Sequence, residues 1–235
     1  MKILLEICAG SVGSALYAQE GGADRIELCS ALPLGGLTPG YGTIKEAKRL
    51  LSIPVYVLIR PREGDFVYSD NELAVICEDI FAAKELGADG IVCGALDNDG
   101  NIDVQAMEKI LQASQGFPFT FHRAFDLCVD PLASLHTLTG MGVNTLLTSG
   151  QAATAEEGAD LIKELVAMAQ PKGLTVMPGC GLHAGIIAGV ATTTGATAIH
   201  LSAKRSVAKG GYDQTDVEEV RSCRKALDSI IYMIK

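Results

Sequence analysis

Residues 4–8, LLEIC, and residues 25–29, RIELC, repeat one pattern: an apolar run followed by Glu, one aliphatic residue and Cys. Both runs are short and lie next to turn-forming residues, which is typical of buried strands. Helical periodicity covers residues 12–20 between them. The chain therefore starts with a strand, a helix and a second strand, and this order predicts an α/β fold.

The same alternation continues to the end of the chain. Strands are expected at 3–8, 25–29, 55–60, 90–94, 118–123, 144–148, 174–178 and 198–202. Helices are expected near 12–20, 41–51, 70–86, 103–115, 131–140, 155–170, 183–193 and 214–230, with start signals at Ser69-Asp70, Asp103, Asp130 and Thr154. Eight strands, each followed by a helix, predict a single-domain (β/α)8 TIM barrel over residues 1–235. An open doubly wound sheet is the alternative, but the first turn has no GxGxxG motif.

Composition excludes several classes of protein. The chain has 235 residues, of which 48% are hydrophobic and 20% charged, with a net charge of −9. This acidic balance argues against nucleic acid as a partner. No segment has the length of a membrane span or the pattern of a signal peptide, so we expect a cytoplasmic protein without membrane contact. The seven cysteines are expected to be free thiols. The sequence is compatible with a homo-oligomer, but it shows no surface patch that decides the oligomeric state.

Polar residues gather at the predicted strand ends, where barrels carry their functional sites. Period-two alternation places Glu6 with Cys8, Glu27 with Cys29, and Arg60 with Arg62 on the barrel interior. Buried charges are costly unless they are paired, so these side chains predict a compensated ring around a polar pocket. A purely structural ion-pair network is the alternative. The ring comprises Glu6, Glu27, Arg60, Arg62 and His122.

Several longer motifs identify a family. GADRIELC, GGLTPG, IRPREGDFVYSD, TFHRAFD and LTSG closely resemble the CutC family, whose members are named as copper homeostasis proteins. The resemblance spans nearly the whole chain and implies a TIM barrel. It also implies that Cys8 and Cys29 are Cu(I) ligands. The chain has GGLTPG where the family has GGLTPS, and MPGCGL at its seventh strand end.

The copper prediction has arguments on both sides. Thiolates are soft ligands that select Cu(I), and neighbouring strands lie within reach of a shared ion. Cys8 and Cys29 are expected at different heights, however, and nearby carboxylates raise the pKa of a thiol. The alternative makes both cysteines small buried hydrophobes. Cys93, Met177 and Cys180 offer further sulfur, while Cys77, Cys128 and Cys223 are expected to be packing residues.

The second hypothesis is a cofactor-independent enzyme that acts on a small carboxylated or phosphorylated metabolite. Its candidates for general acid and base are Glu6, Glu27, His122 and His200. Guanidinium groups match the geometry of carboxylates and phosphates. The candidate ligand-binding residues are Arg25, Arg60, Arg62, Arg123, Asp126, Ser149 and Ser202. Asp126 is expected either to orient His122 or Arg123 or to cap the next turn. Residues 64–70 are expected to form a lid, and His136 and His183 to lie on helix surfaces.

Overall fold

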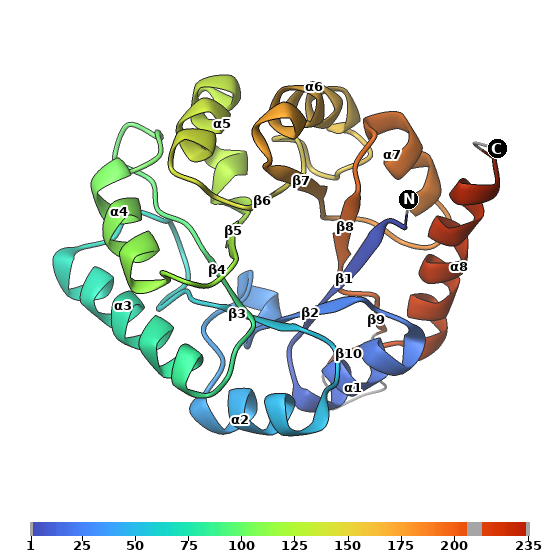
Figure 1. The fold of residues 1–235 in the computed structure, drawn as a ribbon, viewed down its shortest axis with the longest axis horizontal. Helices are drawn as coiled ribbons and strands as arrows, with labels where there is room; N and C mark the ends of the chain where they lie inside the picture. Colours follow the sequence, from blue (N-terminus) through green and yellow to red (C-terminus); the bar gives the residue numbers. More distant parts are fainter. Residues whose placement is uncertain (1, 206–212, 234–235) are drawn as a thin grey trace.

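Eight parallel strands form the centre of the molecule. The computed structural model describes residues 2–205 and 213–233. The strands hydrogen-bond in the order β7-β6-β5-β4-β3-β2-β1-β8, and a parallel bridge from Gly179 to His200 joins the two ends of this sheet. Helices surround the strands (Figure 1). The predicted TIM barrel is therefore confirmed.

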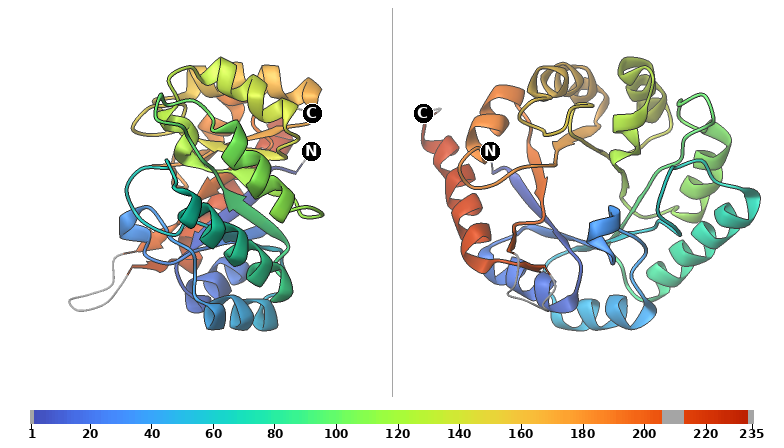
Figure 2. Two further views of the ribbon diagram at one scale, coloured as in Figure 1. Left: turned by 90° about the vertical axis from the view of Figure 1, so that its left-hand side faces the viewer. Right: turned by 180° about the vertical axis from the view of Figure 1, so that it is seen from behind.

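The eight strands are short, as expected for the core of a barrel. Their bounds are β1 Leu4–Ala9, β2 Arg25–Leu28, β3 Val55–Leu58, β4 Gly90–Cys93, β5 Phe119–Phe121, β6 Thr145–Thr148, β7 Thr175–Pro178 and β8 Ala198–Leu201. A small antiparallel pair that the sequence pattern did not indicate, β9 (Lys204–Arg205) with β10 (Gln214–Thr215), follows β8. In the side view of Figure 2 this pair lies at the end of the barrel opposite the N-terminus.

The helices begin and end largely where their capping residues predict. Their bounds are α1 Val12–Gly21, α2 Tyr41–Leu50, α3 Asp70–Glu85, α4 Val104–Ala113, α5 Pro131–Gly140, α6 Ala159–Ala169, α7 Ile187–Thr194 and α8 Val217–Met233, with 3-10 turns η1 Leu32–Leu34, η2 Arg123–Leu127 and η3 Gln170–Lys172. Ser69 caps α3 through a reciprocal capping box with Glu72. Within the described residues, no helix is both long and apolar enough to span a membrane.

Two predicted helix starts were wrong by four residues. The sequence placed the start of α6 at residue 155 after Thr154, whereas the helix begins at Ala159. Thr154 Oγ1 does accept from the amide of Glu157, but that bond closes a turn instead of a helix. The helix expected from residue 183 begins at Ile187. His183 consequently lies in a loop, and its predicted position on a helix surface is corrected.

The two faces of each strand have different surroundings. Outward side chains such as Ile7, Ile26 and Ile59 belong to one continuous apolar core between strands and helices. Inward side chains fall into two small apolar groups, one with Cys8 and Cys29 and one with Leu147 and Met177. Buried charged residues fill the space between these inner groups. Period-two alternation thus separates an apolar outer layer from a polar barrel interior.

Candidate functional site

A buried ion-pair network lies at the seam between β1, β2 and β8. Glu6 is level with Arg25 on one side and with His200 on the other. Its carboxylate accepts from Arg25 Nε and lies 2.8 Å from His200 Nδ1. Burial alone would raise the pKa of Glu6, but the Arg25 and His200 charges lower it below the ordinary value. Glu6 is therefore an ionised carboxylate that compensates its two neighbours.

Arg25 is fixed inside the barrel by this network. Its guanidinium also stacks over the Tyr56 ring at 4.1 Å and lies 3.7 Å from Met177 Sδ. The residue is not among those that line the cavity described below. Met177, which the sequence offered as a further sulfur for a metal, is thus engaged with Arg25.

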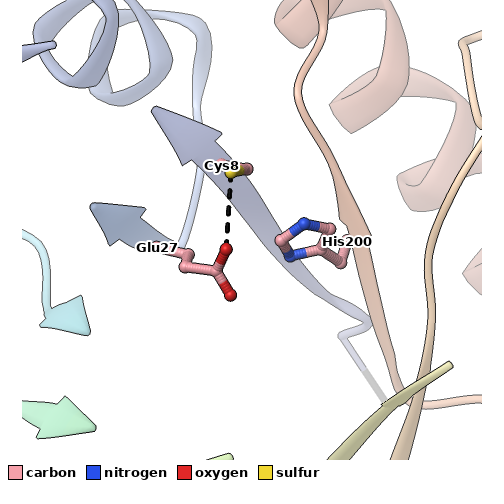
Figure 3. A group of neighbouring side chains, drawn as sticks. All are labelled: Cys8, Glu27 and His200. Carbon is pink, nitrogen blue, oxygen red and sulfur yellow. Dashed lines mark hydrogen bonds between the residues drawn. The ribbon is translucent and has the colours of Figure 1, made fainter. Parts of the chain in front are cut away.

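The two strand-end cysteines meet although they belong to different layers. Cys8 is level with Glu27, so Cys29 lies two residues further along its strand. The predicted difference in height is confirmed, yet the two Sγ atoms are only 3.5 Å apart. Cys8 Sγ also lies 3.4 Å from Glu27 Oε1 (Figure 3). Contact with Cys29, burial and the nearby Glu27 carboxylate all raise the pKa of Cys8 well above its ordinary value.

Three donor atoms of different kinds converge at this point. One ligand atom each from Cys8, Glu27 and His200 lie within 4.8 Å of one another. Figure 3 shows the imidazole beside the cysteine and the carboxylate. Glu6 holds Nδ1 of His200, which leaves Nε2 as its available ligand atom. A carboxylate that orients a histidine in this way is common around protein metal sites.

The protonation of the histidine and of the second glutamate follows from their neighbours. Burial would lower the pKa of His200, but Glu27 and Glu6 more than offset it and raise the value. Burial raises the pKa of Glu27, and the positive charge of His200 opposes that shift only in part. Glu27 Oε2 is buried without a hydrogen-bond partner. The surroundings therefore raise the pKa values of both the His200 imidazole and the Glu27 carboxyl group.

A cavity of about 880 Å³ opens beside these donors at the carboxyl ends of the strands. Cys8, Glu27 and His200 line one part of it, and Arg60, His122 and Arg123 line another. Its apolar lining includes Leu58 and Phe66. The predicted pocket at this end of the barrel is therefore present, and it brings together residues from β1, β2, β8 and the segments that follow β3 and β5.

Arg60 is held by backbone oxygen atoms. Its two terminal nitrogens donate to the carbonyls of Leu34, Gly36 and Gly64 at 3.1, 3.1 and 2.7 Å. Its guanidinium packs over the Phe66 ring at 4.7 Å. The residue is 5% exposed, and within residues 2–205 and 213–233 it forms no ion pair. These carbonyls position the positive charge without neutralising it.

His122 is a buried neutral imidazole. Its Nδ1 accepts from the amide of Ala124, so the proton of the neutral ring is on Nε2, and Nε2 has no hydrogen-bond partner. Burial and the charge of Arg60 lower the pKa of His122 to about 3. Phe66 packs against the ring, with centroids 4.8 Å apart. His122 is therefore a fixed hydrogen-bond donor.

Several positions expected from the sequence are corrected. Arg62 does not share the interior face with Arg60, because it bonds Glu72 and Asp65 and holds the loop before α3. Cys93 points outward into the apolar core instead of toward the other sulfurs. Within the predicted start signal Ser69-Asp70, Ser69 is the N-cap of α3. An alternation argument fails for Arg62 because the strand has already ended at Leu58.

Asp126 orients Arg123 rather than His122. Its carboxylate accepts from Arg123 Nε at 2.8 Å and from the amide of Ser149. Ser149 Oγ in turn accepts from Arg123 Nη2 at 3.1 Å. Asp126 and Ser149 therefore support Arg123 without lining the cavity themselves. Ser202 does line it, and its binding role stays a prediction.

Several lining residues were not among the predicted ligand-binding residues, although the predicted lid, residues 64–70, includes Phe66. His183 and Gly185 come from a loop that the pattern assigned to a helix, and Phe66 comes from the loop after β3. Lys204 and Arg205 lie at the cavity on β9, where each forms an ion pair with an aspartate. The aromatic residue in GDFVYSD was the one available signal, because an apolar side chain in a polar loop needs a surface to cover it. Cys180, expected as a further sulfur, lines the cavity.

Comparison with known proteins agrees with the sequence motifs. The model of the CutC family matches residues 3–205. A CutC family protein from Bacteroides thetaiotaomicron is 47% identical over 207 residues, which cover 88% of this chain and 83% of the relative. A CutC family protein from Pasteurella multocida is 48% identical over 204 residues, with coverages of 87% and 82%.

Solved structures extend this agreement to three dimensions. A CutC structure from Streptococcus agalactiae, whose name proposes a role in copper homeostasis, has a TM-score of 0.81 and 38% identity. The match covers 85% of this chain and 98% of that one. Phosphoribosylanthranilate isomerase from Pyrococcus furiosus has a TM-score of 0.61 at 15% identity, with coverages of 97% and 99%, and this likeness concerns the fold alone.

Proposed function

The chain belongs to the CutC family, and from this premise we propose that it binds a copper ion at the carboxyl ends of β1, β2 and β8. The observation that carries the proposal is the 3.5 Å separation of Cys8 Sγ and Cys29 Sγ. Two thiolates at this separation are a soft donor pair of the kind that selects Cu(I). The cytoplasm, which keeps copper reduced and thiols free, is the compartment that fits such a site.

The neighbouring donors fit a metal ion as well. A ring nitrogen of His200 and an oxygen of Glu27 lie in the same group as Cys8 Sγ. Imidazole is a good ligand for copper, whereas carboxylate suits harder ions. We therefore assign Cys8, Cys29 and His200 as the copper ligands. In the metal-free protein, Glu27 Oε1 accepts a hydrogen bond from the Cys8 thiol. Because the Cys8 thiol has a raised pKa, binding must release its proton.

An anaerobic competition titration tests the copper site. Cu(I) would be titrated into the protein against a strong chelator, using wild type and the Cys8→Ser/Cys29→Ser double variant. We expect one tightly bound copper ion per chain in wild type and none in the double variant. His200→Gln should weaken binding by at least about tenfold, since it removes an oriented donor.

The chain offers a matched control for these thiols. Cys93 and Cys223 are also buried and free but lie in the outer core. The Cys93→Ala/Cys223→Ala double variant should bind copper as wild type does. Weak binding that is equal in all three proteins would contradict the proposal and make Cys8 and Cys29 packing residues.

A further inference from the structure

The cavity is far larger than a metal ion needs. Its volume of about 880 Å³ falls within the range of roughly 300–1,000 Å³ that is usual for small-molecule sites. The copper donors occupy only the wall formed by β1, β2 and β8. Leu32, Leu58, Phe66 and Leu182 contribute apolar surface to the remainder. A cavity of this size with mixed lining is suited to an organic molecule.

The charge of Arg60 indicates the sign of that molecule. Arg60 is 5% exposed and, in the described part of the chain, has carbonyl oxygens but no carboxylate as partners. A buried cation without a counter-charge is costly, and an anion in the cavity would lower that cost. By contrast, Arg123 is neutralised by Asp126, Lys204 by Asp213 and Arg205 by Asp216. Arg60 thus gives this wall an uncompensated positive charge.

His122 adds a neutral donor beside this charge. Its Nε2 is buried without a partner, and its ring is fixed by the Ala124 amide and by Phe66. Phe66 contacts both the imidazole and the Arg60 guanidinium, so both groups lie next to one ring. A buried donor without an acceptor is unfavourable. An anionic oxygen would satisfy it.

One uncompensated guanidinium and one neutral imidazole correspond to a single negative charge. A phosphate dianion would carry one negative charge more than Arg60 balances. A carboxylate balances Arg60 alone, and its two oxygens suit adjacent N–H donors. We propose that the cavity binds a small organic monocarboxylate with an apolar body, with the carboxylate group beside Arg60 and His122. The site requires no metal ion.

Benzoate and benzamide provide a probe and its uncharged counterpart. Each would be titrated by calorimetry into reduced, chelator-treated protein, with inorganic phosphate as a third probe. We expect one benzoate per chain, a higher melting temperature with benzoate, and neither effect with benzamide. The same benzoate binding in Cys8→Ser/Cys29→Ser would separate this site from the copper proposal. Equal binding of benzoate and benzamide, or tighter binding of phosphate, would overturn the carboxylate assignment.

Two variants test whether Arg60 and His122 bind the carboxylate. His122→Phe keeps an aromatic ring of similar size and removes the donor, and Arg60→Lys keeps the charge but not the planar fork. We expect each to weaken benzoate binding at least about tenfold, the usual effect of a lost charge-assisted hydrogen bond. Arg49→Gln, a change at an exposed arginine on α2, is the control and should leave the affinity unchanged. Unchanged affinity in His122→Phe would overturn the placement.

Should Arg60→Lys fail to fold, the wild-type imidazole provides a direct measurement. The Nε2–H signal of His122 in a nitrogen-15 spectrum should shift on addition of benzoate and stay in place with benzamide. A signal that is unaffected by saturating benzoate would overturn the proposal.

Discussion

The outward and inward faces of the same strands differ in what they contribute. Outward residues such as Ile59 pack against helices in one continuous apolar core. Inward residues such as Glu27 are also buried but ionisable, and they line a cavity instead of packing against a helix. The outer layer supplies hydrophobic stability, while the interior pairs its charges and keeps groups whose hydrogen bonds are incomplete. Burial alone therefore does not say whether a residue stabilises the barrel or serves its site.

Adjacent residues at the end of β3 test this difference with the largest expected effect. Ile59 points outward and is fully buried, whereas Leu58 points inward and lines the cavity. Ile59→Ala should cost roughly 4 kcal/mol of unfolding free energy because it leaves an enclosed void, and Leu58→Ala only roughly 2 kcal/mol because its space opens into the cavity. Urea unfolding at neutral pH measures both. Equal losses would show that the inner face stabilises the barrel as much as the outer one.

Alternation along the strands predicted much of this arrangement from sequence. It placed Glu6, Cys8, Glu27, Cys29 and Arg60 inside the barrel, where the structure has them. The same argument could not give partners across the seam, since Glu6 and His200 are 194 residues apart and meet only when the barrel closes.

Side chains beyond the strand ends were less predictable. Arg62 follows the loop to Glu72, and Arg60 finds backbone carbonyls from glycine-containing turns that have no distinctive side chains. The apolar character of GDFVYSD hints at a covered loop, but not that Phe66 packs against both Arg60 and His122. Loop geometry, which strand periodicity does not describe, decides these contacts.

Within the inner face, the buried network should respond strongly to loss of charge. Glu6→Gln keeps the shape of the side chain but leaves Arg25 without its ion-pair partner. We expect a loss of about 3 kcal/mol in unfolding free energy, because the remaining charge stays buried. Glu46→Gln removes an exposed ion pair with Arg49 on α2 and should leave the unfolding free energy close to that of wild type, because solvent screens exposed pairs. Losses of similar size in the two variants would show that the buried pair stabilises the barrel no more than the exposed one does.

The buried imidazole predicts a pH dependence that the outer core does not share. His122 has its pKa lowered to about 3 in the folded protein, against about 6.5 in an unfolded chain. Its contribution is fully present above pH 6.5 and is lost as the pH falls, because only the unfolded state takes up the proton. The loss should reach about 2 kcal/mol between pH 6.5 and pH 5.

Unfolding titrations at several pH values measure this loss. His122→Phe should remove about 2 kcal/mol of the decrease between pH 6.5 and pH 5, because phenylalanine takes up no proton. His136→Gln, at an exposed position on α5, should keep it. If His122→Phe retained the full decrease, another group would be its source.

The smallest expected effect compares two cysteines that differ only in the face they occupy. Cys93 lies in the apolar outer core, and burial raises the pKa of its thiol to about 12. Cys93→Ser places a hydroxyl there and should cost about 1.5 kcal/mol. Cys8 already lies within hydrogen-bond distance of Glu27 Oε1, so the hydroxyl of Cys8→Ser has an acceptor and should cost less than about 1 kcal/mol. Copper affinity should change in the opposite order, with a loss in Cys8→Ser and none in Cys93→Ser. Measuring stability and copper affinity on both variants therefore distinguishes a cysteine that packs the core from one that binds metal.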